Sequence, residues 1–282
     1  MRDIDLKNNQ SQRITDRNPY VDFFRIVLML MIVIHHSIVH GLGLVNLRDN
    51  LPADVSGVVL SLNAFVVVAV NCFFWISGFY KIQFRWKKFI DLLLEVVFYV
   101  IVTNIIVMVV GHEFIEVGTF IKHTIGFIGS YWFMAVYFAL YILSPYLNRL
   151  IENITWKEAY MLALILLGVN TLYGFFKDWA NIGTGYSLAQ AIYIYLIGRV
   201  CYVWYDKIND NLKQWQSLGI YFVCGIAIAI AVIFLCDMGV YALAWRMYAY
   251  NNPLVVIAAV NLCMYIVKIE RPAGGDNVSG KM

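Results

Sequence analysis

The sequence predicts an all-α integral membrane protein, a polytopic bundle of about eight membrane-spanning helices. Of the 282 residues, 61% are hydrophobic and only 14% are charged, whereas a soluble domain carries about 25% charged residues. The apolar residues fall into segments close to the roughly 20 residues that cross a hydrocarbon core about 30 Å thick. Short loops rich in Gly, Asn, Asp and Pro separate these segments.

The transmembrane domain is expected to occupy residues 20–268. Its expected spans are 20–42, 57–80, 88–110, 131–149, 158–176, 186–205, 215–237 and 253–268. The last is short, so it is open to being tilted, interfacial or part of a broken element. Residues 1–19 are expected to form a polar cytosolic tail. The first helix is expected to be retained in the mature protein, because a secretory signal would have a shorter apolar core. The polar, Gly-rich residues 269–282 are expected to be disordered.

The distribution of Lys and Arg predicts a cytosolic N-terminus. With this orientation, sixteen of the 21 basic residues fall on the cytosolic side and one, Arg25, lies inside the first helix. The opposite side receives only Arg48, Lys122, Lys177 and Arg246. A net charge of +3 is not typical of nucleic-acid binding, so no nucleic-acid partner is expected.

The five cysteines occur singly in apolar segments, without a CxxC pair. Such cysteines behave as small hydrophobic residues, and the sequence indicates neither a disulfide framework nor a zinc ribbon. His36 and His40 are spaced to chelate one ion together, but no third ligand with recognisable spacing accompanies them. No metal site is therefore expected.

The first helix, YVDFFRIVLMLMIVIHHSIVHG, carries the most specific pattern. Arg25 and His36 are eleven positions apart, so they differ by about 20° around a helix and share one face. Their rise of roughly 16 Å places His36 near the bilayer midplane if Arg25 lies at the cytosolic interface. Asp22 and His40 lie within about 60° of this stripe, while His35 points elsewhere.

An ionisable group at the bilayer centre is a candidate for function, because leaving it there costs a few kcal/mol. Histidine suits proton transfer near neutral pH, so His36 is the candidate catalytic residue. The alternative is a histidine that packs by hydrogen bonding between helices, which is favoured for His35 and His40. Arg25 taken alone would also fit the role of an interfacial anchor. Its register with His36 favours a role in the candidate catalytic site.

Four phrases of the sequence resemble the membrane acyltransferase 3 family, which includes polysaccharide O-acetyltransferases. That family's first helix carries Arg or Lys, ten residues and then His, which Arg25 and His36 match. Its second helix ends in a phrase matched here by Phe73, Phe74, Ser77 and Gly78. A later helix resembles YWFMAVYFALYILSPYLNRL, and the segment GYSLAQAIYIYLIGR resembles another, with Tyr195, Gly198 and Arg199 near its cytosolic end. The resemblance runs from about residue 18 to residue 268.

The resemblance implies transfer of an acyl group from a cytosolic acyl-CoA, such as acetyl-CoA, to a hydroxyl of a cell-surface or lipid-linked polysaccharide. Acetyl-CoA is then a co-substrate, and no bound cofactor is implied. Family members often carry Arg-x-x-Arg after the second helix, implicated in handling the donor; Arg85 and Lys88 stand in that place. Lysine offers phosphate a point charge and no bidentate fork. The family usually has about ten helices, and its closing pair has no counterpart here.

The family function suggests how the polar residues act together. The donor phosphates would bind the basic loop, and the thioester would then pass Arg25 to reach His36, which acts as general base or transient acyl carrier. The loop's basic residues are Lys81, Arg85, Lys87 and Lys88. Orientation and lipid headgroup contact explain this loop equally well. Glu95, inside the third helix, is a candidate for pairing with Arg25 or for orienting the histidine, and a purely structural ion pair is the favoured alternative.

Aromatic residues begin the fourth expected helix at the outer interface: Tyr131, Trp132 and Tyr137. They are candidates for stacking on a sugar ring, although an interfacial aromatic belt is the commoner role. His112 and His123 are expected to be solvated in the preceding outer loop.

Two other readings remain open. A transporter or flippase for a lipid-linked saccharide would use the same polar stripe as a passage, without any dependence on acyl-CoA. An inactive, truncated family member, or a non-catalytic membrane subunit, is the other. All three readings place a multi-pass protein in the cell membrane, with the lipid bilayer as its partner. The acyl group, the acceptor and the oligomeric state are left open by the sequence.

Overall fold

A computed structural model of the chain describes residues 19–111, 131–176 and 184–270. Within these ranges the secondary structure is helical, with no strand. This confirms the all-α prediction. The expected tails, together with His112 and His123, lie outside the described residues. The exceptions are Pro19, which begins the first helix, and residues 269–270, which end the last helix.

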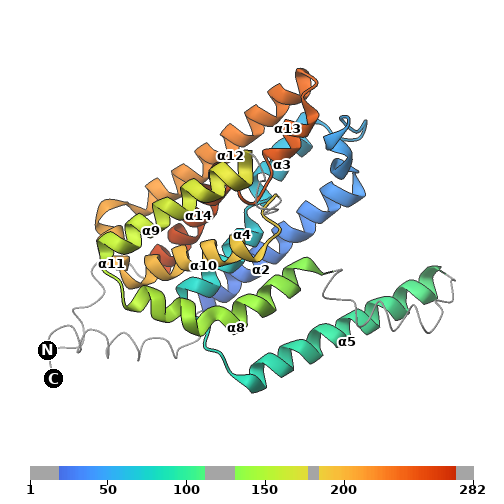
Figure 1. The fold of residues 1–282 in the computed structure, drawn as a ribbon. Coiled ribbons are helices and arrows are strands. Elements are labelled where there is room, and N and C mark those ends of the chain that lie inside the picture. Colours follow the sequence, from blue (N-terminus) through green and yellow to red (C-terminus); the bar gives the residue numbers. More distant parts are fainter. Residues whose placement is uncertain (1–18, 112–130, 177–183, 271–282) are drawn as a thin grey trace, which may run out of the picture.

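The helices follow one another as α2 (Pro19–His36), η1 (Ser37–Gly41), η2 (Leu44–Arg48), α3 (Gly57–Val66), α4 (Ala69–Phe79), α5 (Trp86–Gly111), α8 (Trp132–Glu152), α9 (Trp156–Val169), η3 (Asn170–Phe176), α10 (Leu188–Val203), α11 (Tyr205–Asn211), α12 (Gln214–Asp237), α13 (Tyr241–Arg246) and α14 (Pro253–Glu270). Figure 1 shows them as one elongated bundle, with α5 at its edge beyond α8.

Six stretches of the described chain are long and apolar enough to cross a membrane. They are Pro19–Gly41, Gly57–Phe79, Trp86–Gly111, Trp132–Glu152, Trp156–Phe176 and Gln214–Asp237. Two shorter apolar helices, Leu188–Val203 and Pro253–Ile269, accompany them. All eight coincide with expected spans. The chain is a multi-pass membrane protein.

Local sequence sets where several helices begin. Ser56 and Ser187 accept hydrogen bonds from the backbone N–H of Val59 and Gln190, as N-cap serines do. At the start of α9, Thr155 and Glu158 form a capping box, in which the Glu158 carboxylate accepts a 2.7 Å bond from the Thr155 N–H. These caps pair backbone donors that the first turn of a helix leaves free.

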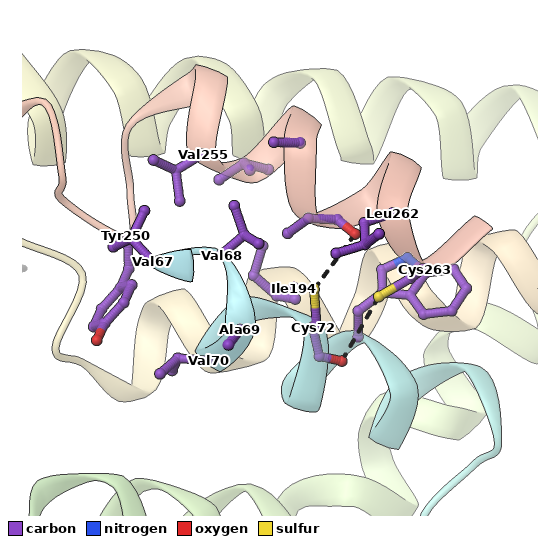
Figure 2. Close-up of a cluster of buried hydrophobic side chains, with 14 of the residues drawn as sticks. Val67, Val68, Ala69, Val70, Cys72, Ile194, Tyr250, Val255, Leu262 and Cys263 are labelled. Carbon is purple, nitrogen blue, oxygen red and sulfur yellow. Dashed lines mark hydrogen bonds between the residues drawn. The ribbon is translucent and has the colours of Figure 1, made fainter. Parts of the chain in front are cut away.

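Helix α4 lies at the centre of the bundle and packs against α10, α14 and α2 (Figure 1). Figure 2 shows the apolar side chains at this centre, including Val68, Ile194 and Val255. Cys72 and Cys263 lie among them, and each thiol points to a backbone carbonyl across the α4–α14 contact (Figure 2). All five cysteines are buried and free, in agreement with their expected role as small hydrophobic residues.

A non-helical segment between α13 and α14 is buried in the bundle, although unpaired backbone is costly at membrane depth. The Tyr250 carbonyl accepts hydrogen bonds from the carboxamides of Asn71 (2.9 Å) and Gln190 (2.8 Å). Asn170 in turn donates to Gln190 at 2.8 Å. Buried side-chain amides thus take the place of the helical hydrogen bonds that this segment lacks.

Helix α5 contacts the rest of the described structure mainly through α8. Val100 and Phe138 are buried at this contact, with Phe89 packed against them. Most of the remaining surface of α5 is exposed and apolar, as expected for a helix that faces lipid. Glu95 lies exposed on this helix.

Candidate functional site

The predicted polar stripe lies along one side of α2. Arg25 forms an ion pair with Asp22 one turn earlier, at 3.0 Å, and its side chain is 45% exposed. His36 is exposed at the end of the helix, and His35 is buried. Within the described chain Glu95 forms no salt bridge, so the suggested Glu95–Arg25 pair is wrong. Arg25 pairs with Asp22 instead, because residues spaced i, i+3 are neighbours on the surface of a helix.

The Tyr137 hydroxyl of α8 joins this stripe near Arg25. It interacts electrostatically with Ser77 of α4 and with the Arg25 guanidinium. Three helices thus contribute to one polar cluster, here called the Arg25 cluster: Arg25, Ser77 and Tyr137. Tyr137 was expected at the outer interface, which is wrong, because Ser77 lies at the opposite, cytosolic end of its expected span.

The three histidines at the other end of α2 have different environments. The His35 Nδ1 lies 2.7 Å from the Asn63 Oδ1 in the buried α2–α3 contact, which confirms the packing role favoured for His35. The His36 ring lies 5.9 Å from that of His35 and 5.7 Å from that of His40. His36 and His40 are both exposed.

The helix changes its hydrogen-bonding pattern directly after His36. Residues Ser37–Gly41 form a π-helical turn, and the Ser37 hydroxyl donates to the Val33 carbonyl at 2.9 Å. Single π-helical turns within α-helices are frequent at functional sites. Sequence periodicity does not predict such a turn.

The basic loop after α4 is divided between paired and exposed residues. The Lys81 ammonium lies 2.7 Å from the Glu152 carboxylate, so its charge is already compensated. Arg85, Lys87 and Lys88 are exposed, which leaves the two residues predicted to bind the donor, Arg85 and Lys88, available for an anion.

Tyr195 and Arg199 are held inside the bundle. The Tyr195 hydroxyl donates to the Asn148 Oδ1 at 2.8 Å, and Arg199, 2% exposed, pairs with Glu152 at 3.3 Å. The Arg199 guanidinium also lies over the Tyr202 ring, 5.2 Å from its centre. The burial and partners of Tyr195 and Arg199 indicate that they support the site through packing and charge balance.

Trp132 belongs to an aromatic cluster with Tyr186 and Tyr250, at ring-centre distances of 4.6 and 5.8 Å. Tyr250 stacks on one Trp132 face, so that face is closed to a sugar ring. A small pocket beside this cluster is lined by His35, Thr184, Tyr186, Trp245, Tyr248 and Ala249.

A larger, apolar cavity of about 480 Å³ lies between α2, α12 and α14. Phe24, Val27 and Met31 line it, on a different face of α2 from Arg25. It is therefore separate from the polar stripe. In the described ranges no three His, Cys, Asp or Glu side chains are grouped to hold a metal ion.

The fold and the polar stripe together define a polytopic membrane protein with a row of ionisable groups along one side of α2. A family model described as an acyltransferase domain matches residues 18–278. The chain belongs to the acyltransferase 3 family and is a membrane acyltransferase, as the resemblance predicted. Neither a curated protein nor a solved structure gives a match.

Sequence reasoning missed the neighbours of the predicted residues. Asn63 was not singled out, nor were Tyr141 and Asn148, which lie in the phrase LYILSPYLN that carried the family resemblance. A signal for Asn63 existed, because a lone carboxamide in an apolar helix needs a polar partner. Its partner lies in another helix, so only the folded chain identifies it.

Proposed function

We propose that this acyltransferase transfers an acetyl group from cytosolic acetyl-CoA to a hydroxyl of a cell-surface or lipid-linked polysaccharide, at the cell membrane. The observation that supports this best is the arrangement along α2. The Arg25 cluster brings together side chains of three helices at one end of the stripe, and the exposed His36 lies at the other.

Arg85 and Lys88 bind the phosphates of the donor, since both are exposed at the start of α5. Arginine forms bidentate hydrogen bonds with phosphate, whereas lysine supplies a point charge. The pantetheine arm then enters beside Arg25, and the thioester carbon comes near His36. Acetyl-CoA is consumed as a co-substrate in this reaction.

His36 acts as general base on the acceptor hydroxyl. The hydroxyl oxygen forms a bond to the thioester carbonyl carbon, and the carbon–sulfur bond breaks. The proton taken up by His36 passes to the departing thiolate, so the products are an acetyl ester and free coenzyme A. The alternative route forms an acetyl-imidazole on His36 before the acceptor attacks.

The central test uses membranes that contain the protein, with radiolabelled acetyl-CoA and extracted glycan as acceptor. His36→Ala is expected to lower acetylation about 10²- to 10⁴-fold, the usual contribution of a general acid–base group. His40→Ala is the matched control, since this histidine lies in the same segment and is also exposed. Unchanged acetylation in His36→Ala would refute the assignment of His36.

The same preparation separates the enzyme from a transporter. Movement of a lipid-linked saccharide that needs no acyl-CoA and yields no ester would favour the transporter. Formation of the ester with release of free coenzyme A supports the enzyme.

A further inference from the structure

One face of α8 holds the backbone that connects α4 to α5. Figure 1 shows this connection passing α8 before α5 begins. Tyr141 and Asn148 form hydrogen bonds with this backbone, and Glu152 pairs with the Lys81 side chain at its start. These three positions are spaced by seven and four residues, so they lie within about 40° of one another around the helix. We call them the α8 clamp.

Tyr141 pairs the backbone directly before α5. Its hydroxyl accepts a hydrogen bond from the Arg85 N–H and donates one to the Gln83 carbonyl, both at 3.2 Å. The Tyr141 ring packs against Phe84, with 5.4 Å between ring centres. One side chain therefore fixes both the backbone and an aromatic side chain of the loop.

Asn148 holds the loop one step earlier. Its amide group donates to the Ile82 carbonyl at 3.0 Å, and its Oδ1 accepts from the Tyr195 hydroxyl at 2.8 Å. Tyr195 is fully buried, so the amide is oriented by a side chain that has little freedom to move. This fixes the position of the Ile82 backbone relative to α10 as well as α8.

Glu152 completes the set at the first residue of the loop, Lys81. The Lys81 backbone has a φ of +59°, a left-handed conformation that favours glycine. The ion pair with Glu152 at 2.7 Å holds the lysine side chain while the backbone turns out of α4.

We infer that the α8 clamp is a positioning device for the acyl donor. Its hydrogen bonds hold the backbone from Ile82 to Arg85, and so determine where Arg85 and Lys88 present their charges. Long basic side chains on a mobile loop lose freedom when they bind phosphate, and a fixed backbone reduces that cost. The clamp residues need not touch the donor. This inference rests on the proposed donor role of Arg85 and Lys88.

The sharpest test is Tyr141→Phe in the full-length protein. It removes one hydroxyl and both of its hydrogen bonds, while the ring that packs against Phe84 stays. The KM for acetyl-CoA is expected to rise roughly fivefold to thirtyfold. The kcat at saturating donor and the KM for the acceptor are expected to stay within about twofold, because only donor binding is weakened. A general packing defect would change all three parameters.

Tyr146→Phe is the matched control. Tyr146 lies in the same helix and is 69% exposed, and the change again removes one phenolic hydroxyl. Its kinetic constants are expected to equal those of the wild type. A rise in donor KM in both variants would overturn the specific role of Tyr141.

Hydrogen–deuterium exchange in nanodiscs tests the clamp without any activity. The backbone amide of Arg85 is expected to exchange faster in Tyr141→Phe than in Tyr146→Phe, because it loses its acceptor. Equal exchange would overturn the clamp. Faster exchange with an unchanged donor KM in an active enzyme would overturn its positioning role. A wild-type protein that neither binds nor consumes acetyl-CoA would instead refute the proposed function.

Discussion

Gly78 of α4 and Gly198 of α10 lie against each other where these two helices cross. A Cβ added to Gly78 would lie 2.1 Å from the Tyr195 carbonyl oxygen, and one added to Gly198 would lie 2.3 Å from the Trp75 carbonyl oxygen. Small residues allow membrane helices to approach this closely. The crossing places Ser77, beside Gly78, next to the helix that carries Tyr195.

Gly198→Ala is expected to destabilise the protein by about 1–3 kcal/mol or more, because the new methyl group meets rigid backbone and not a movable side chain. Thermal unfolding in detergent measures the effect. Gly219→Ala is the matched control, since a Cβ on Gly219 of α12 meets nothing within 4 Å. Equal melting temperatures for the two variants would contradict the close crossing.

His35→Ala is expected to lower stability by about 1–3 kcal/mol, because the change leaves the buried Asn63 side chain without its partner. The double variant His35→Ala/Asn63→Ala is expected to recover part of this loss, since the unpaired amide is then gone. Denaturation measurements on the wild type, the single variant and the double variant check the order. If the single His35 variant were the most stable of them, the pair would not contribute to stability.

Tyr137 and Ser77 are expected to act together on donor use. Tyr137→Phe and Ser77→Ala each remove one hydroxyl of this interacting pair beside Arg25. Each should lower kcat/KM for acetyl-CoA by a few-fold to about tenfold, the value of one polar interaction. The double variant should fall short of the product of the two effects, with a coupling of about 0.5–3 kcal/mol. Effects that multiply without coupling would show that the two residues act independently.

Glu152→Gln is expected to destabilise the protein more than Arg199→Met. Arg199 is 2% exposed, and its Nε and Nη1 have no hydrogen-bond partner among the described residues. Removing the Glu152 charge leaves this guanidinium buried and uncompensated, whereas Arg199→Met leaves Glu152 paired with Lys81. The cost is about 1–3 kcal/mol, below that of a fully buried pair, because the Glu152 side chain is 37% exposed.

Chemical denaturation in mixed micelles measures these differences. The double variant Glu152→Gln/Arg199→Met is expected to be more stable than Glu152→Gln alone, because it removes the unpaired charge. If Glu152→Gln matched the wild type, the guanidinium would not depend on Glu152.

The positions of residues around their own helix were predicted well, because they depend only on helical spacing. Asp22, Arg25 and His36 share the side of α2 that a period of 3.6 residues gives them, and His35 turns into the bundle as expected. The contacts of residues with a second helix were predicted less well. Tyr137 was assigned to the outer interface because it begins an apolar segment, yet it interacts with Ser77, which lies at the end of α4 expected on the cytosolic side.

The sequence by itself determined the membrane class, the eight apolar helices and the polar stripe of α2. These follow from composition and from helical geometry, which act within one segment. Only the tertiary structure decided which side chains meet: Asn63 with His35, Tyr137 with Ser77, and Tyr141 with the backbone at Arg85. The physical reason is that a buried polar group must find a partner, and each partner here comes from a segment far along the chain, brought near by helix packing.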